Sequence, residues 1–158
     1  MANSNLTQNI NLLKPTGFKL TIDSSRFSNI EFFITNATIP GISLSQIVTA
    51  FRGHNSNLEG EPIEYESFSI VCKVDEDLRG MIEIFDWMKR NADQEIADFV
   101  DITLSVLTSH NNPNVFFHFR NAFPIQLSGF ELTVADDTEP SINITFAYDY
   151  YEIEKLDN

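Results

Sequence analysis

The stretch SFSIVCKVDEDLRGMIEIFDWMKRN, residues 67–91, decides the fold expected of this chain. Its first part predicts a strand, which the acidic run 75–77 interrupts. Carboxylates suit the start of a helix, because they accept free backbone N–H groups and oppose the positive end of the helix dipole. Downstream, apolar residues recur at helical spacing as one stripe: Leu78, Met81, Ile82, Phe85 and Met88. The stretch therefore predicts a strand, an acidic break and one amphipathic helix from Asp77 to Asn91.

The remaining helix positions allow two interpretations of how the helix packs. Four charged residues lie largely off the apolar stripe: Arg79, Glu83, Asp86 and Arg90. Ile84 and Trp87 widen the apolar surface beyond the stripe. We favour a helix seated deeply against a sheet. The alternative is that Trp87 covers a joint between subunits.

The rest of the chain predicts strands and turns. Alternating or apolar-rich segments predict strands over residues 17–23, 30–38, 42–52, 61–74, 101–108, 115–120, 125–134 and 141–153. Many strands with one packed helix predict a mainly β fold: a β-sandwich or partly closed barrel with a long β-hairpin and one flanking α-helix. Residues 1–16 are polar and Asn-rich, which predicts a flexible N-terminal arm. Residues 17–158 contain no linker or repeat, so we expect one β domain.

The long hairpin is expected from residues 42–52 and 61–74, with residues 53–62 as a polar loop at its tip. Its polar and apolar residues do not separate cleanly onto two faces. That mixture fits poorly with a sheet that has one buried and one wet face. Either the second face meets another subunit, or the segment is a soluble two-sided hairpin.

Composition narrows the classes of function. The chain of 158 residues has 42% hydrophobic and 12% aromatic residues, enough for one domain with a real core. Its net charge is −13, which argues against gripping DNA or RNA, because that needs clustered Lys and Arg. No apolar run approaches the roughly 20 residues of a membrane span, so we expect no membrane insertion. With Cys72 as the one cysteine, no internal disulfide forms.

No pattern of catalytic or metal-binding residues is evident, so we expect no enzyme activity, cofactor or metal. The three histidines, His54, His110 and His118, do not match a metal-ligand spacing. Cys72 lies mid-strand, which favours a small core residue over a nucleophile. Two alternatives stay open: a monomeric β-sandwich that binds another protein, and an enzyme with two dispersed carboxylates.

The chain resembles the tail-tube and baseplate-tube proteins of contractile-tailed phages. The resemblance rests on FSIVCKVDED followed by a helix with an Asp-Trp pair, IFDWMKRN; on the strand FPIQLSGFELTV; and on the acidic turn ADDTEP before INITFAYDYYEI. It extends from Gly17 to the C-terminus. Its most specific parts are the Asp86-Trp87 pair and the Phe146-Ala147-Tyr148 ending. The bacterial type VI secretion tube is a related architecture.

This resemblance implies a structural virion protein, assembled in the host cytoplasm into the phage tail. Six copies would form a ring, and stacked rings would form the inner tube, in contact with sheath and baseplate or neck proteins. Genomic DNA would pass through the acidic channel without specific binding. Tube-initiator, adapter and terminal rings share this core and are alternatives. The implied lumen or ring-edge residues are Glu59, Glu61, Glu64 and Glu66. The implied inter-ring or sheath contacts are Arg79, Glu83, Asp86, Trp87 and Arg90.

Overall fold

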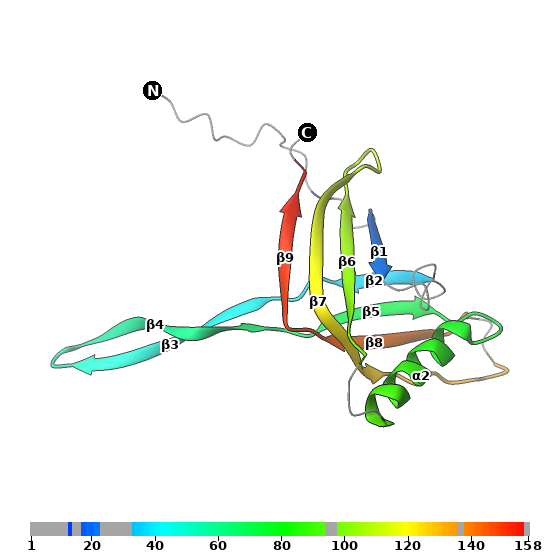
Figure 1. Cartoon of the computed structure of the whole chain (residues 1–158), viewed down its shortest axis with the longest axis horizontal. Coiled ribbons are helices and arrows are strands. Elements are labelled where there is room, and N and C mark those ends of the chain that lie inside the picture. Colours follow the sequence, from blue (N-terminus) through cyan, green and yellow to red (C-terminus); the bar gives the residue numbers. More distant parts are fainter. Residues whose placement is uncertain (1–12, 14–16, 23–32, 94–97, 136–137, 157–158) are drawn as a thin grey trace.

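Figure 1 shows the computed structural model, which describes residues 13, 17–22, 33–93, 98–135 and 138–156. Apart from Leu13, the predicted N-terminal arm lies outside the described residues. The elements, in chain order, are β1 (Phe18–Ile22), β2 (Ile34–Thr38), β3 (Ile42–Phe51), β4 (His54–Tyr65), β5 (Phe68–Lys73), α2 (Arg79–Asp93), β6 (Val100–Leu107), β7 (Pro113–Leu127), β8 (Ser141–Ala147) and β9 (Tyr150–Lys155). The predicted mainly β fold with a long hairpin and a flanking helix is confirmed.

Two groups of antiparallel strands cross one another and share β7 (Figure 1). The hydrogen-bonded order is β1-β6-β7-β8-β5-β2, and β9 also pairs with β7. The first part of β7 pairs with β6 on one edge and β9 on the other, whereas its last residues, 123–127, pair with β8. One strand therefore belongs to both layers, as at the corner of an orthogonally packed sandwich.

The core lies where the two layers cross. Phe68, Phe119 and Phe146 are fully buried, and the rings of Phe68 and Phe119 stack with centroids 4.4 Å apart. Phe68, Ile70 and Cys72 alternate inward along β5. Cys72 is a buried core residue, and burial raises the pKa of its thiol to about 12. At neutral pH this thiol is therefore protonated and a poor nucleophile.

The corner of β7 depends on Asn121, whose φ of 54° is in the left-handed region. The backbone N–H of Asn121 donates to Asp101 Oδ1 at 3.0 Å, and its Nδ2 donates to Asp149 Oδ2 at 2.6 Å. Arg120 reaches Asp101 Oδ2 at 2.7 Å and Glu152 Oε2 at 3.0 Å. β6, β7 and the start of β9 are thus tied together at the bend.

The predicted strand over residues 141–153 is wrong in one respect, because the chain bends at Tyr148-Asp149 and forms β8 and β9. Both strands follow the same edge of β7, so the bend occurs where β7 itself turns. Apolar alternation runs through the bend, which is why the pattern predicts a single strand.

Other predicted strand limits also need correction. The polar loop over residues 53–62 is wrong: Arg52-Gly53 forms the turn, and β4 starts at His54. The predicted strand 61–74 is interrupted at Glu66-Ser67, between β4 and β5.

Strand β7 continues through Pro124, beside a register shift that tolerates a residue without an N–H. The predicted strand 125–134 ends at residue 127, and Leu132 and Val134 are exposed.

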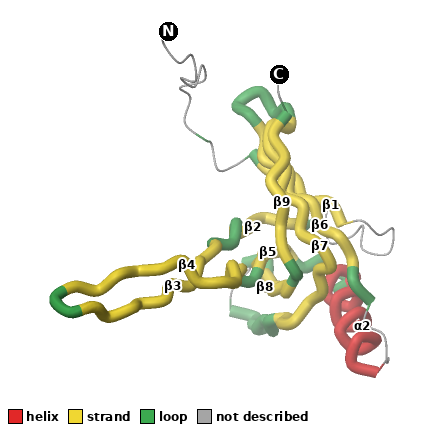
Figure 2. Tube along the Cα trace, turned by 60° about the vertical axis from the view of Figure 1, so that its left-hand side comes forward, coloured by secondary structure: helices red, strands yellow, loops and turns green. Residues whose placement is uncertain are grey.

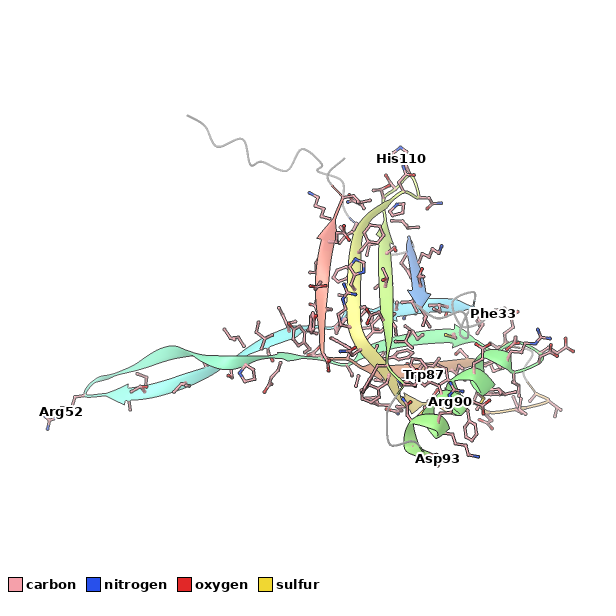
Figure 3. The ribbon with its side chains drawn as sticks, in the orientation of Figure 1. Phe33, Arg52, Trp87, Arg90, Asp93 and His110 are labelled. Carbon is pink, nitrogen blue, oxygen red and sulfur yellow. The ribbon has the colours of Figure 1, made fainter. Side chains whose placement is uncertain are left out.

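Helix α2 runs from Arg79 to Asp93, two residues later at both ends than predicted. Leu78 has a φ of 55°, which is not helical, and Asp75 Oδ2 accepts the N–H of Arg79 at 3.2 Å. Trp87 is fully buried between the helix and the strands (Figure 3), and its Nε1 donates to the Asp98 carbonyl at 2.8 Å. The interpretation of a helix seated on a sheet is confirmed.

The buried face of α2 differs from the predicted stripe. Ile84 and Trp87 are its buried residues, with Met81 and Met88 packed beside them, whereas Ile82 and Phe85 of the stripe are exposed. The apolar arc spans both sets, so periodicity alone did not select the face that packs.

We expect Asn121→Val to lower the free energy of unfolding by about 2 kcal/mol or more. A β-branched residue is strained at positive φ, and the bond to Asp149 is lost. Asn121→Gly loses the same bond but accepts the backbone angle, so its loss should stay within about 1 kcal/mol. Urea unfolding checks both variants. Equal losses would show that the left-handed backbone is not what holds the corner.

Candidate assembly surfaces

The hairpin of β3 and β4 extends away from the body as a separate two-stranded ribbon (Figures 1 and 2). Its ladder runs from the pair Ile42–Tyr65 to the pair Phe51–His54, and Gly53 turns the tip with a φ of 97°. Among the described residues, β3 and β4 pair only with each other. Each strand therefore presents an outer edge of unpaired backbone groups, a template for pairing with another chain.

Apolar side chains occupy both faces of this hairpin. Leu44 and Ile63 are a cross-strand pair near the base and are both exposed. Farther out, the neighbours Ile47 and Val48 point to opposite faces and are 57% and 54% exposed. A hairpin that stayed in water on one face would carry polar residues there, so this hairpin lacks the pattern of a sheet with one buried and one wet face.

The middle of the hairpin contains an irregularity. The register shifts between Leu44 and Gln46, and β4 carries the extra residues. At Gly60 a Cβ would lie 2.6 Å from Ser45 Oγ and 2.9 Å from the Ser45 carbonyl oxygen. Only glycine therefore lets the two backbones approach this closely.

The four predicted lumen or ring-edge carboxylates all belong to the hairpin or its base. Glu59, Glu61 and Glu64 are on β4, and Glu66 follows it. Glu64 lies opposite Ser43 and is exposed. Glu66 Oε2 accepts the N–H of Gly41 at 3.0 Å, so this carboxylate contacts the base of the hairpin. The side chains of Glu59 and Glu61 lie outside the described part of the structure.

The outer side of α2 forms a second exposed surface. An open groove of about 650 Å³ lies between the helix and the end of β7, lined by Met81, Phe85, Met88, Lys89, Leu127, Ser128 and Gly129. Phe85 is 57% exposed at this groove. Sequence reasoning placed Phe85 on the packing face and so missed the groove.

The predicted inter-ring or sheath residues of α2 divide into two sets. Arg79 and Asp86 are exposed, and Arg79 pairs with Asp77 at 2.8 Å. Glu83 is half-buried, and Arg90 lies 3.9 Å from Asp98. Trp87 is buried inside its own subunit, which removes it from any external contact surface.

The described residues hold no cluster of three or more His, Cys, Asp or Glu side chains that could bind a metal ion. His118 instead bonds Thr103 Oγ1 at 3.1 Å and Glu154 Oε2 at 3.1 Å on the sheet surface. Within the part of the chain that the structure describes, no helix has the length and hydropathy needed to span a membrane.

The architecture is similar to that of several solved structures. The chain is similar to the anti-feeding prophage cap, a tube-terminating cap, with a TM-score of 0.71 and 19% identity over 99% of this chain and 100% of that one. It is similar to a chain of the sheath/tube terminator of the extracellular contractile injection system PVC, with a TM-score of 0.72 and 18% identity over 92% and 99% of the two chains. No family model and no curated protein matches the sequence.

The chain has the fold of contractile-injection tube proteins. This tube fold extends to an Hcp protein from Flavobacterium johnsoniae, with a TM-score of 0.56 and 14% identity over 89% of this chain and 98% of that one. Both the phage-tail resemblance and the related type VI architecture expected from the sequence therefore agree with the fold. The alignment with the anti-feeding prophage cap covers 99% of this chain, so it includes both the hairpin and α2.

We expect Gly60→Ala to loosen the hairpin while the body stays intact. The added Cβ meets backbone atoms of Ser45, so the strands must separate locally. Hydrogen exchange should show faster exchange of the β3 and β4 amides, by about tenfold, with body amides unchanged. Gly129→Ala is the matched control, because a Cβ there has no atom within 4 Å. Equal protection in the two variants would contradict the close-approach argument.

Proposed function

We propose that the protein is a structural subunit of a hexameric ring that stacks into the inner tube of a contractile phage tail. The observation that carries this proposal is the free-standing β3–β4 hairpin, with apolar side chains on both faces and two open edges. It occurs on a body with the tube fold. The protein would be assembled in the host cytoplasm and incorporated in the virion tail.

In this proposal the hairpins of neighbouring subunits pair edge to edge and form a continuous barrel. Pairing would satisfy the open backbone groups of β3 and β4 and remove the hazard of exposed edges. One face would line the channel and the other would pack on neighbouring subunits. This accounts for Ile47 and Val48, which lie on opposite faces and are both exposed in the single chain.

The charge of the chain supports a channel for nucleic acid that does not bind it. The net charge is −13, and Glu64 is exposed on β4. A negative wall repels phosphates, so genomic DNA would slide during ejection rather than adhere. Glu59, Glu61 and Glu64 are the proposed lining carboxylates.

The outer side of α2 is the proposed contact with the next ring, the sheath, or baseplate and neck proteins. The groove beside Phe85 supplies an apolar centre with the charged Lys89 in its lining, and Arg79 and Asp86 are exposed on the same helix. Apolar centres with polar rims are typical of protein interfaces.

A second candidate is a tube-terminating ring. The full-length likeness to the anti-feeding prophage cap favours it, since 99% of this chain and 100% of that chain align. The two roles share the hairpin ring and differ in whether rings add on one side or both. Electron microscopy of the purified protein separates them, because single rings support the terminator and long hollow tubes support the main tube.

We expect the wild-type protein to form rings or tubes, and the double variant Leu44→Ser and Ile63→Ser to remain monomeric. Each residue would give up roughly 1.5–3 kcal/mol of apolar burial on assembly, so association should weaken at least about 100-fold. Leu132→Ser with Val134→Ser is the control, since both are exposed outside the hairpin. Negative-stain microscopy and solution mass over a concentration series are the measurements. Wild-type protein that stays monomeric even with added baseplates would contradict the proposal.

We expect Glu61→Lys with Glu64→Lys to let tubes form but make them hold DNA. Positive side chains in the channel attract phosphates and release counterions. Glu76→Lys with Glu131→Lys changes the net charge equally at exposed positions outside the hairpin. Anisotropy of labelled duplex DNA with assembled tubes should rise for the hairpin variant alone. The same DNA affinity in both variants would place the lumen elsewhere.

A further inference from the structure

The hairpin joins the body through two short segments, one before β3 and one after β4. The segments are held together by Glu66. Its backbone N–H donates to the Gly41 carbonyl at 3.1 Å, and its Oε2 accepts the Gly41 N–H at 3.0 Å. A Cβ at Gly41 would lie 3.0 Å from that carboxylate oxygen, so glycine leaves the room that the carboxylate uses.

Two tyrosines, Tyr148 in the bend between β8 and β9 and Tyr151 at the start of β9, bind the same two segments. The hydroxyl of Tyr148 donates to the Glu66 carbonyl at 2.6 Å, and that of Tyr151 to the Pro40 carbonyl at 3.4 Å. Each tyrosine thus holds one of the two connections. Burial raises the pKa of Tyr148 to about 12, so its hydroxyl remains a donor at neutral pH.

Aromatic rings continue this contact into the core. The ring of Tyr65, at the end of β4, lies 6.1 Å from that of Tyr148 and 5.5 Å from that of Tyr151. The rings of Tyr148 and Tyr151 lie 5.0 Å and 5.6 Å from that of the buried Phe119. The base of the hairpin is therefore connected through ring contacts to the buried core of the body.

A small tilt at this base has a large effect at the tip. A hairpin of about ten residues per strand is roughly 30 Å long at about 3.3 Å per residue. A tilt of about 10° moves its tip by roughly 5 Å, which is about one strand spacing. Edge-to-edge pairing with a neighbouring subunit therefore needs the direction of the hairpin to be fixed before the strands meet.

We propose that Glu66, Tyr148 and Tyr151 are positioning residues that fix the direction of the β3–β4 hairpin for pairing between subunits. The role in pairing rests on the proposed function, whereas the fixed direction is a property of the single chain. On this view Glu66 holds the base of the hairpin and does not line the channel.

The test compares Tyr148→Phe with Tyr151→Phe, as a double variant, with Tyr150→Phe. The double variant keeps both rings against Phe119 and removes only the hydroxyls. Tyr150, which is exposed on the same strand, is the control. Spin labels at Arg52→Cys, at the hairpin tip, and His110→Cys, at the far turn of the body, report the direction of the hairpin (Figure 3). The buried, protonated Cys72 should not take up the label.

We expect the label-to-label distance distribution of the monomer to be narrow in the wild-type background and in Tyr150→Phe, and at least about twofold wider in the double variant. The concentration needed for rings should rise about tenfold, as expected when two hydrogen bonds no longer preorganise the hairpin. Glu66→Ala, which removes the carboxylate but keeps the carbonyl that Tyr148 binds, should also widen the distribution. Glu66→Ala takes the place of the double tyrosine variant if the double variant does not fold.

An unchanged distance distribution in both variants would overturn the positioning role, whether or not rings form. A wider distribution with an unchanged concentration for ring formation would overturn the link to pairing. If the distribution widens but the wild-type protein forms no rings with any template, the proposed function fails while the fixed direction of the hairpin is supported.

Discussion

The left-handed backbone at Asn121 is the constraint on which the rest of the structure depends. It turns β7 from one layer into the other, and the chain that forms β8 and β9 bends at Asp149 to stay paired with it. The hydrogen bond from Asn121 Nδ2 to Asp149 Oδ2 joins the two bends, and Asp101 fixes the β7 bend to the start of β6. Arg120 lies between the carboxylates of Asp101 and Glu152. Partial burial acts to raise the pKa of Asp101, but hydrogen bonds from Arg120 and from the Asn121 N–H outweigh this effect, so that the pKa of Asp101 is lowered.

This corner also determines where the hairpin begins. Tyr148 and Tyr151 flank the bend at Asp149, so a shift of the corner would move the hydroxyls that bind the Glu66 and Pro40 carbonyls. The same two rings contact Phe119 in the core. Contacts therefore link core packing, the bend and the base of the hairpin, although the residues are widely separated in sequence. The hairpin itself has no interior, since its apolar side chains Leu44, Ile47 and Val48 are exposed. A fixed direction of the hairpin must therefore come from the contacts at its base.

Sequence patterns predicted what depends on local periodicity and missed what depends on partners across the fold. Its place in a strand correctly predicted that Cys72 is a core residue, and the acidic break correctly separated β5 from the helix. Alternation could not show the bend at Tyr148-Asp149, because the apolar pattern of the sequence runs through it, whereas in the structure Tyr151 and not Tyr150 packs on the core after the bend. It also could not choose between Ile84 and Phe85 as the packing face of α2, since the whole arc is apolar.

The hairpin tip was mistaken for a loop because β4 is rich in Asn, Ser and Glu. Strands paired only in a ribbon do not need the apolar alternation of a core strand. The sequence shows Tyr148 and Tyr151 near the bend, but only the structure shows that their hydroxyls bind the Glu66 and Pro40 carbonyls at the base of the hairpin.

Exposed edges and a strongly negative chain act together under the proposed function. An apolar two-stranded ribbon with open edges is prone to pair with any available strand. A net charge of −13 makes random encounters between subunits repulsive. Only an approach that aligns both edges along the full ladder gains enough backbone pairing and apolar burial to overcome that repulsion. A hairpin held in one direction reaches this alignment with little further loss of conformational entropy, whereas a swinging one must be ordered at the moment of contact. Under the proposed function, charge therefore suppresses wrong contacts and the fixed base favours the right one, which is how a subunit would carry an open sheet edge until it assembles.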